Sequence, residues 1–150
     1  MSSPGTVQPL TGPSTRYPMT PIEFLRTIYL GDRQCKAFHI DGHKGEVKIE
    51  VNVISRVRGQ AWDFYSEEDL QDGFVVLEGV SSIAFEPSGP LPNDWIEFES
   101  AHPLEKEGTY RISLSVGAAS ADSASVVEVK VEIVATSLCL ENSKGERIRS

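Results

Sequence analysis

One short stretch gathers the residues most able to do chemistry, residues 65–73, which read YSEEDLQDG. Four carboxylates fall within six residues: Glu67, Glu68, Asp69 and Asp72. A calcium loop of the EF-hand type needs acids at alternating positions, then Gly, then a distant Glu, but these acids are adjacent and Gly73 comes too late. Carboxylates for glycoside chemistry must face each other across a cleft, which neighbours on a turn do not. The stretch predicts either a solvated turn or a contact surface for a basic partner.

A second cluster is His39, Asp41 and His43, which would share one face of an extended strand and could bind a transition metal. Residues 41–45 read DGHKG, however, a composition typical of a turn. A turn breaks the alignment, so we expect a hairpin end with exposed polar residues and no metal site.

Signatures of catalysis and of phosphate binding are absent from the sequence. Nucleophilic catalysis needs a Ser or Cys with a base and an orienting group, and no GxSxG occurs. Neither GxxxxGK[ST] nor GxGxxG is present. Cys35 and Cys139 occupy strand-like apolar positions and are expected to be buried, reduced side chains. We therefore expect no cofactor and favour a non-enzymatic protein, although an enzymatic activity stays open.

Charge is divided unevenly along the chain. Residues 59–105, the acidic interval, contain no Lys or Arg and hold eleven of the 22 acids, whereas all 14 bases lie outside it. With a net charge of −8, the chain is a poor candidate for binding nucleic acid or an anionic membrane. Its natural partner is a basic surface.

The first hypothesis is therefore a protein-binding module with a basic protein partner, engaged through the acidic interval. Trp and Tyr are common interface anchors, although core packing is the alternative for these aromatic residues. The predicted contact residues are Trp62, Asp63, Tyr65, Glu67, Glu68, Asp69, Asp72, Asp94 and Trp95. The runner-up is a small-ligand-binding or enzymatic, β-barrel-like domain with an aromatic pocket near Trp62, Trp95 and Tyr110. A structural subunit that pairs through a sheet face or edge is a third reading.

The elements that must position these residues follow from periodicity. Thr20, Pro21 and Glu23 form a capping-box start, and the apolar spacing predicts a helix over 21–30 that Gly31 ends. Two-residue alternation then predicts strands at 34–41, 46–57, 94–101, 109–116 and 125–135, with shorter apolar runs at 74–77, 80–85 and 138–140. The alternation loses phase at Val53 and Ile54, which predicts a bulge or a bend. Residues 117–123 read as a small-residue loop, and the final ten as frayed.

These elements predict a mainly β (α+β) fold: an antiparallel sheet, sandwich or partly open barrel of about seven or eight strands with one short N-terminal helix. Residues 1–19 are rich in Pro, Ser, Thr and Gly and predict a disordered tail, with Met19 a second candidate start. Residues 20–150 then form a single β-rich domain. No apolar run reaches the ~20 residues of a membrane helix and no secretory signal is visible, so we expect a cytoplasmic protein.

Two segments carry a family resemblance: TPIEFLRTIYLGDR at 20–33 and ISRVRGQAWDFYSEEDLQDGFVVLEGVSSIAFEPSGPLPND at 54–94. They resemble a family of small bacterial proteins of unknown function, over Met19 to the C-terminus. Small acidic β-rich proteins of this kind also resemble the immunity proteins of bacterial toxin systems, which bind a cognate toxin and block it, often by presenting carboxylates to a basic active site. The resemblance implies a bacterial, cytoplasmic, non-enzymatic protein and assigns no residue a role.

Overall fold

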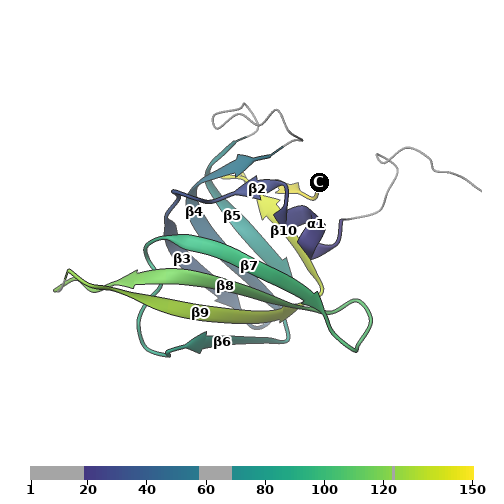
Figure 1. Cartoon of the computed structure of the whole chain (residues 1–150). Helices are drawn as coiled ribbons and strands as arrows, with labels where there is room; N and C mark the ends of the chain where they lie inside the picture. Colours follow the sequence, from purple (N-terminus) through teal and green to yellow (C-terminus); the bar gives the residue numbers. More distant parts are fainter. Residues whose placement is uncertain (1–18, 58–68, 123) are drawn as a thin grey trace, which may run out of the picture.

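Two antiparallel sheets pack face to face in the computed structural model, which describes residues 19–57, 69–122 and 124–150 (Figure 1). The elements are α1 (Pro21–Leu25), β2 (Ile28–Tyr29), β3 (Cys35–Asp41), β4 (Glu46–Arg56), β5 (Leu70–Glu78), β6 (Ser82–Glu86), β7 (Ile96–Pro103), β8 (Tyr110–Ala119), β9 (Val126–Ala135), β10 (Ser137–Glu141) and β11 (Arg147–Ile148). The first sheet has the order β11-β10-β5-β4-β2, with β3 also paired to β4, and the second has the order β6-β9-β8-β7.

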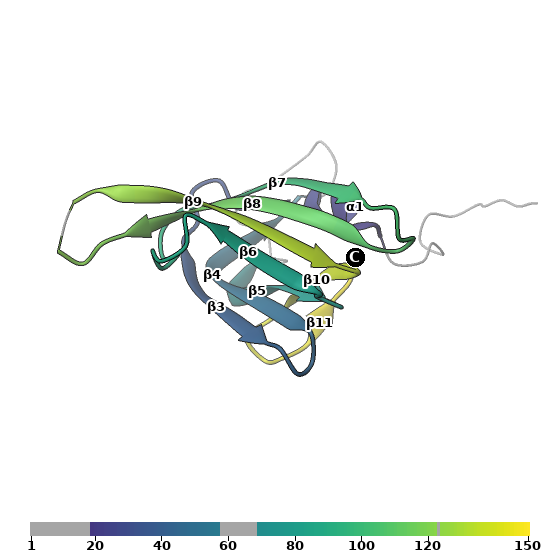
Figure 2. The same cartoon turned by 90° about the horizontal axis from the view of Figure 1, so that it is seen from below.

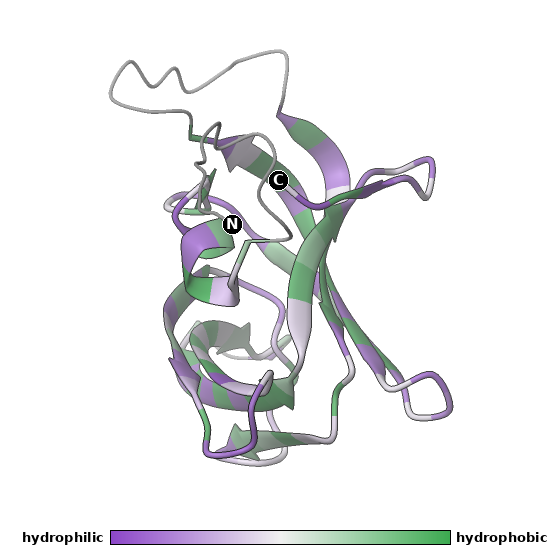
Figure 3. Cartoon of the chain, turned by 90° about the vertical axis from the view of Figure 1, so that its right-hand side faces the viewer, coloured by the Kyte–Doolittle hydropathy of each residue, from purple (hydrophilic) through white to green (hydrophobic). Residues whose placement is uncertain are grey.

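The core lies between the two sheets, where the period-two pattern places it. In β4, Val47, Ile49 and Val51 are fully buried, while Lys48 and Glu50 face outward. Ile112 and Leu114 of β8 are buried in the same core from the opposite sheet. Figure 3 shows the resulting alternation of hydrophilic and hydrophobic residues along the strands. The predicted fold class is confirmed: the described chain is mainly β, with a short N-terminal helix and no closed barrel.

The helix is shorter than predicted. The capping box forms as expected, with Glu23 N–H donating to Thr20 Oγ1 and Thr20 N–H donating to Glu23 Oε1. The helix ends at Leu25, however, and Ile28 and Tyr29 pair with Arg56 and Ser55 as strand β2. The prediction of a helix to residue 30 was wrong because β2 is only two residues long and depends on a partner 26 residues or more away in sequence.

The predicted bulge at Val53 and Ile54 does not interrupt the pairing of β4 with β5, although the burial alternation of β4 changes phase there. The pairing of β4 with β5 runs from Val51↔Gly73 to Val53↔Gln71 without a pair between Asn52 and Asp72. Asp72 there has a φ of 53°, a left-handed conformation that Asp tolerates better than most residues. The register is the same on both sides of this position, and the change is one of burial: Val51 and Ile54 are buried, whereas Val53 is partly exposed.

The β8–β9 hairpin projects beyond the sandwich, as Figures 1 and 2 both show. Its pairing continues from Tyr110↔Ala135 out to Ala119↔Val126. The predicted loop over 117–123 is therefore wrong for its first three residues, which belong to β8. The glycine at 117 reflects the indole of Trp95 packed on it, and not a turn.

The C-terminal end is ordered by pairing, so the prediction of ten frayed residues was wrong. Asn142 to Gly145 form a turn, and Arg147 and Ile148 pair with Glu141 and Leu140 as β11. At the other end, Met19 packs against the core, and the remainder of the predicted tail lies outside the described residues. Among the helices of the described chain, none has the length and apolar character to cross a membrane.

Candidate functional site

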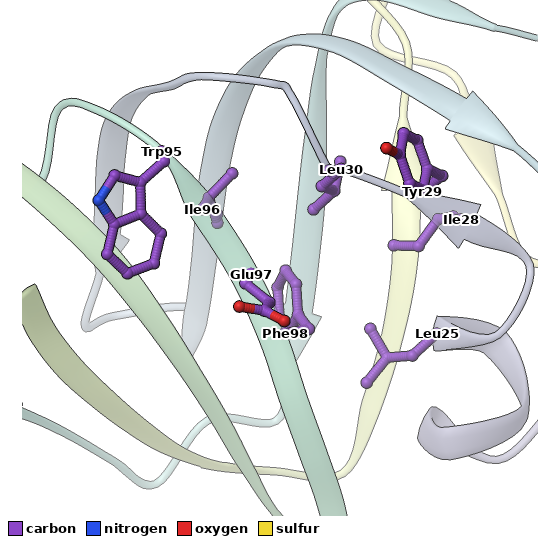
Figure 4. Close-up of a pocket in the computed structure, with 9 residues that line it drawn as sticks. Leu25, Ile28, Tyr29, Leu30, Trp95, Ile96, Glu97 and Phe98 are labelled. Carbon is purple, nitrogen blue, oxygen red and sulfur yellow. The ribbon is translucent and has the colours of Figure 1, made fainter. Parts of the chain in front are cut away.

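A cleft opens where the two sheets diverge, between the segment that carries α1 and β2 and the start of β7. We call it the seam cleft. It has a volume of about 570 Å³. Its apolar lining side chains are Leu25, Ile28, Leu30, Ile96 and Phe98, and its other lining residues are Tyr29, Gly31, Trp95 and Glu97. Figure 4 shows these side chains coming from two opposite walls.

Sheet topology explains why the cleft is there. Strand β7 ends the order of its sheet, and β2 ends the order of the other. Their sheets meet at an isolated antiparallel bridge between Gln34 and Trp95, where Cys35 N–H donates to the carbonyl oxygen of Asp94 at 2.7 Å. Beyond this bridge the cleft separates the two strand edges, with α1 at its far end.

Backbone and side-chain bonds fix the segment that enters β7. Gly117 N–H donates to the carbonyl oxygen of Trp95 at 2.8 Å, and Asp94 N–H donates to the carbonyl oxygen of Gly117 at 3.0 Å. Asn93 clamps Ala119 through both its amide atoms, accepting from its N–H at 2.8 Å and donating to its carbonyl oxygen at 3.0 Å. Asp94 and Trp95, which form one rim of the seam cleft, are therefore held against β8 by several hydrogen bonds.

Trp95 is a half-exposed aromatic side chain on this rim, with 36% of its surface accessible. Its indole covers Gly117, where an added Cβ would lie 2.5 Å from Nε1. A side chain at 117 would thus displace the ring, which accounts for the small residue near the end of β8. The Trp95 ring packs on Gly117 and is partly exposed to solvent. This arrangement is typical of aromatic contact residues.

Glu97 supplies the only formal charge among the described residues that line the seam cleft. Its side chain is exposed, and no ion pair to it is found within the described parts of the chain. It neighbours Trp95 and the buried Ile96. An apolar cleft with a carboxylate and an indole at its rim favours a group that is apolar and positively charged.

The structure places four of the predicted contact residues in two pairs. Asp94 and Trp95 stand on the rim of the cleft. Asp69 and Asp72 lie beside and within β5 of the other sheet, so β4 stands between them and the segments that border the cleft. The other five, Trp62, Asp63, Tyr65, Glu67 and Glu68, lie outside the described residues.

Asp69 is tied into the protein body. Its carboxylate accepts from Ser55 Oγ at 3.2 Å and from Arg56 N–H at 3.3 Å, and Ser55 Oγ also accepts from Arg33 Nη2 at 2.6 Å. Asp72 lies at the surface and pairs with Lys36 Nζ at 3.2 Å. Asp69 therefore has a structural role, and its predicted contact role stays a prediction.

Folding also changes the charge pattern that the sequence displays. Bases from outside the acidic interval reach into it: Lys36 pairs with Asp72, Arg147 and Arg149 with Glu78, and Lys130 with Glu99. The charge separation along the chain is thus partly cancelled in space. The rim of the seam cleft keeps its acidic character, since Asp94 and Glu97 have no ion pair to a described Lys or Arg.

One polar cluster on the outer face of the second sheet has the residue types of a serine–lysine dyad. Ser115 Oγ donates to Glu99 Oε2 at 2.6 Å and accepts from Lys130 Nζ at 2.9 Å. Ser115 is buried at 1% exposure, and hydrogen bonds from Lys130 to Glu99 and Glu128 raise the pKa of the lysine. A dyad needs an accessible hydroxyl and a neutral amine, so this cluster is a structural network.

Two side chains of the predicted histidine cluster, His39 and Asp41, contact other groups. His39 Nε2 lies 3.2 Å from Glu50 Oε1, and Asp41 accepts from Lys44 N–H at 3.0 Å within the exposed β3–β4 turn. The predicted hairpin end is confirmed. No cluster of three His, Cys, Asp or Glu side chains suited to a metal occurs in the part of the chain that the structure describes.

The runner-up hypothesis located a pocket near Trp95 and Tyr110. Trp95 does line the seam cleft, whereas Tyr110 lies at the far end of β8, opposite Pro103, and is not among the lining residues. Tyr29 and Phe98 are the aromatic residues found there instead. Sequence reasoning missed Tyr29 because it read this segment as helix, and it passed over Glu97 and Phe98 as ordinary strand positions.

Fold and site together define a two-sheet antiparallel β protein with an open, apolar cleft and an acidic, aromatic rim. The chain belongs to DUF6258, a family of unknown function that matches it over residues 19–150. Comparisons with curated proteins and with solved structures found no match.

Proposed function

We propose that the protein is a non-enzymatic binding module for a basic protein partner, and that the rim of the seam cleft is part of its contact surface. The observation that carries the proposal is the combination of half-exposed Trp95 and unpaired Glu97 beside an apolar cleft. Hot spots of protein interfaces are commonly aromatic side chains next to a pocket, ringed by polar groups. Acidic residues around them steer a basic partner toward the site.

The most concrete form of this proposal is a bacterial, cytoplasmic immunity protein that masks a basic toxin such as a nuclease. Its support is the net charge of −8, together with the resemblance described above. In this form the carboxylates of Glu67, Glu68, Asp69 and Asp72 accelerate association, and Trp62, Tyr65 and Trp95 hold the complex.

The test begins with capture of the partner from a lysate of the native organism, using full-length protein tagged at its C-terminus, washed at low and then high salt. The captured protein is then purified, and its association rate is measured for wild type and for a variant with amides in place of the four steering carboxylates. We expect association to slow by about tenfold at low salt. An unchanged rate would count against the steering role.

Variants of the rim test the contact surface itself. Trp95→Ala should weaken binding by tenfold or more, and Glu97→Gln by a smaller factor. Glu105→Gln is the matched control, because Glu105 is an exposed acid of the same interval beyond the far end of β7. Equal effects of Glu97→Gln and Glu105→Gln would show that only overall charge matters.

A second candidate function is small-ligand binding in the seam cleft. Its volume of about 570 Å³ lies within the roughly 300–1,000 Å³ of ligand pockets, and most of its lining side chains are aliphatic or aromatic, as in such sites. Screening uncharged apolar fragments by NMR against the full-length protein tests this candidate. Shifts that cluster on the cleft residues would support it, and shifts scattered over the surface would reject it.

A further inference from the structure

We propose that the seam cleft receives an extended segment of the partner, in which an apolar side chain fills the cleft and an adjacent Arg or Lys pairs with Glu97. This inference deepens the proposed function and rests on it, since it names what the partner presents. The occupant is a segment of a basic protein, and three features of the described residues support this choice.

The first feature is the strand edge that forms one wall of the cleft. Strand β7 is the last strand in the order of its sheet, and residues 96–98 of it line the cleft. An edge strand presents a row of backbone donors and acceptors, which an extended peptide can pair by strand addition. A small molecule could form hydrogen bonds with fewer of these backbone groups, so the strand edge favours a polypeptide.

The second feature is the spacing of the side chains along that edge. Ile96 and Phe98 point into the sandwich, with Ile96 at 2% exposure, whereas Trp95 and Glu97 lie on the outer side. The side chains of an added strand alternate in the same way. An apolar residue would therefore enter toward Leu30 and Phe98, and its basic neighbour would emerge beside Glu97 and Trp95 (Figure 4).

The third feature is charge, which argues against a second copy of the same chain as the occupant. Glu97 is the only charged side chain among the described residues that line the cleft, and no described base pairs with it. Another copy would bring the same acidic edge and a net charge of −8, so like charges would oppose pairing of the two β7 edges. A basic segment meets the carboxylate and the indole together, through ion-pair and cation–π contacts.

The experiment titrates three capped peptides into full-length ¹⁵N-labelled protein: Gly-Phe-Arg-Gly, Gly-Phe-Gln-Gly and Gly-Phe-Glu-Gly. The indole N–H signal of Trp95, assigned by its loss in Trp95→Phe, and the amide signals of residues 28–31 and 96–98 report occupancy. We expect the Arg peptide to bind at this cleft about fivefold more tightly than the Gln peptide, and the Glu peptide to bind most weakly. Glu97→Gln should reduce the Arg-over-Gln preference to within about twofold, whereas Glu105→Gln should leave it unchanged.

The other outcomes separate this inference from the function on which it rests. Equal binding of all three peptides would overturn the charge selection while leaving the cleft as a binding site. Binding of 4-phenylbutylamine without any of the peptides would overturn the choice of a polypeptide and favour a free apolar cation. No shift with any probe would overturn the inference, and capture of a partner that still depends on Trp95 would then show that the proposed function stands without it.

Discussion

At the scale of single residues, the contact between Trp95 and Gly117 links the candidate site to the sheet beneath it. Gly117→Ala would place a Cβ within 2.5 Å of the indole Nε1 and 3.0 Å of Val126 Cγ1. Because Trp95 is half-exposed, its ring can move aside, and we expect a loss of about 1 kcal/mol in the free energy of unfolding. Urea denaturation measures the loss, and the Trp95 indole N–H signal should shift.

Gly42→Ala is the control for this substitution, because no atom lies within 4 Å of a Cβ added at the β3–β4 turn. It should change the stability by less than about 0.5 kcal/mol. The pair also permits a double-mutant cycle, in which Gly117→Ala costs less in the Trp95→Ala background. Equal losses of stability with and without the Trp95 side chain would show that contact with the indole does not explain why residue 117 is a glycine.

The two cysteines should be chemically silent in the folded protein. Both are fully buried. Burial raises the pKa of Cys35 to about 12, with Glu50 adding to the effect, and burial raises the pKa of Cys139 to about 11. Because the thiolate is the reactive form, a thiol reagent at pH 8 should label neither residue before unfolding and both after it in urea. Rapid labelling of either thiol in the folded state would contradict this burial.

Sequence reasoning reached part of the candidate site at this scale. It identified Asp94 and Trp95 because an acid beside an indole is recognisable as a residue type. It missed Tyr29 and the apolar wall around Leu30, since their role depends on β7 lying opposite, and nothing in residues 28–31 encodes that neighbour. The cleft forms where residues 28–31 lie opposite residues 95–98. The sequence pointed to a contact site in the second segment alone.

At the scale of elements, β11 shows how a two-residue strand can be held by charge. Arg147 makes ion pairs with Glu46 at 3.0 Å, Glu78 at 2.7 Å and Glu141 at 2.9 Å. The guanidinium is about three-quarters buried, and Glu141 is nearly fully buried. The network joins β4, β5, β10 and β11 on the outer face of the first sheet.

Arg147→Ala should therefore cost about 2 kcal/mol in the free energy of unfolding, because it leaves three partly buried carboxylates close together without their shared cation. Arg111→Ala is the matched control. Its pair with Glu132 is 3.9 Å long with both side chains about half exposed, so its loss should cost less than about 0.5 kcal/mol. Similar losses for the two variants, measured by urea denaturation, would argue against a stabilising network.

The longer strands were predictable from the sequence, and the two-residue strands were not. Strands β4, β8 and β9 each have enough alternation for the period to identify them and their buried face. Strands β2 and β11 have two residues each and form only because Arg56 and Leu140 lie beside them. In the same way, helical spacing from Ile22 to Tyr29 fitted both a helix and the observed helix followed by a strand.

At the scale of the whole molecule, folding redistributes charge that the sequence keeps apart. The acidic interval and the bases outside it are brought together by pairs 31 to 71 residues apart, such as Lys130 with Glu99 and Arg149 with Glu78. No local pattern could have shown this, because the partners meet only through the sheet order. Among the described residues of the acidic interval, Asp94 and Glu97 stay without an ion pair, as do Glu86 and Glu105. The proposed function relies on the first two because they stand beside Trp95.

The same ion pairs make the stability of the whole molecule depend on pH. Hydrogen bonds from Arg149, and further ones from Ser137 and Arg147, outweigh burial and lower the pKa of Glu78 from 4.5 to about 2. A carboxyl whose pKa is lower in the folded state than in the unfolded state binds protons more tightly when unfolded. Its contribution to stability is therefore complete above about pH 4.5 and is lost as the pH falls toward 2.

We expect this contribution to be about 2 kcal/mol, less than the full pKa difference would give, because Arg149 is half exposed and solvent screens its charge. Urea midpoints between pH 7 and pH 2 should fall less steeply in Glu78→Gln than in wild type, and the variant should be the less stable protein at pH 7. Glu105→Gln, which removes an exposed acid, should leave the wild-type profile in place. If Glu78→Gln and wild type instead lose stability in parallel down to pH 2, then the cluster around Arg147 and Arg149 does not set the acid sensitivity, and the cause must lie with the other carboxylates.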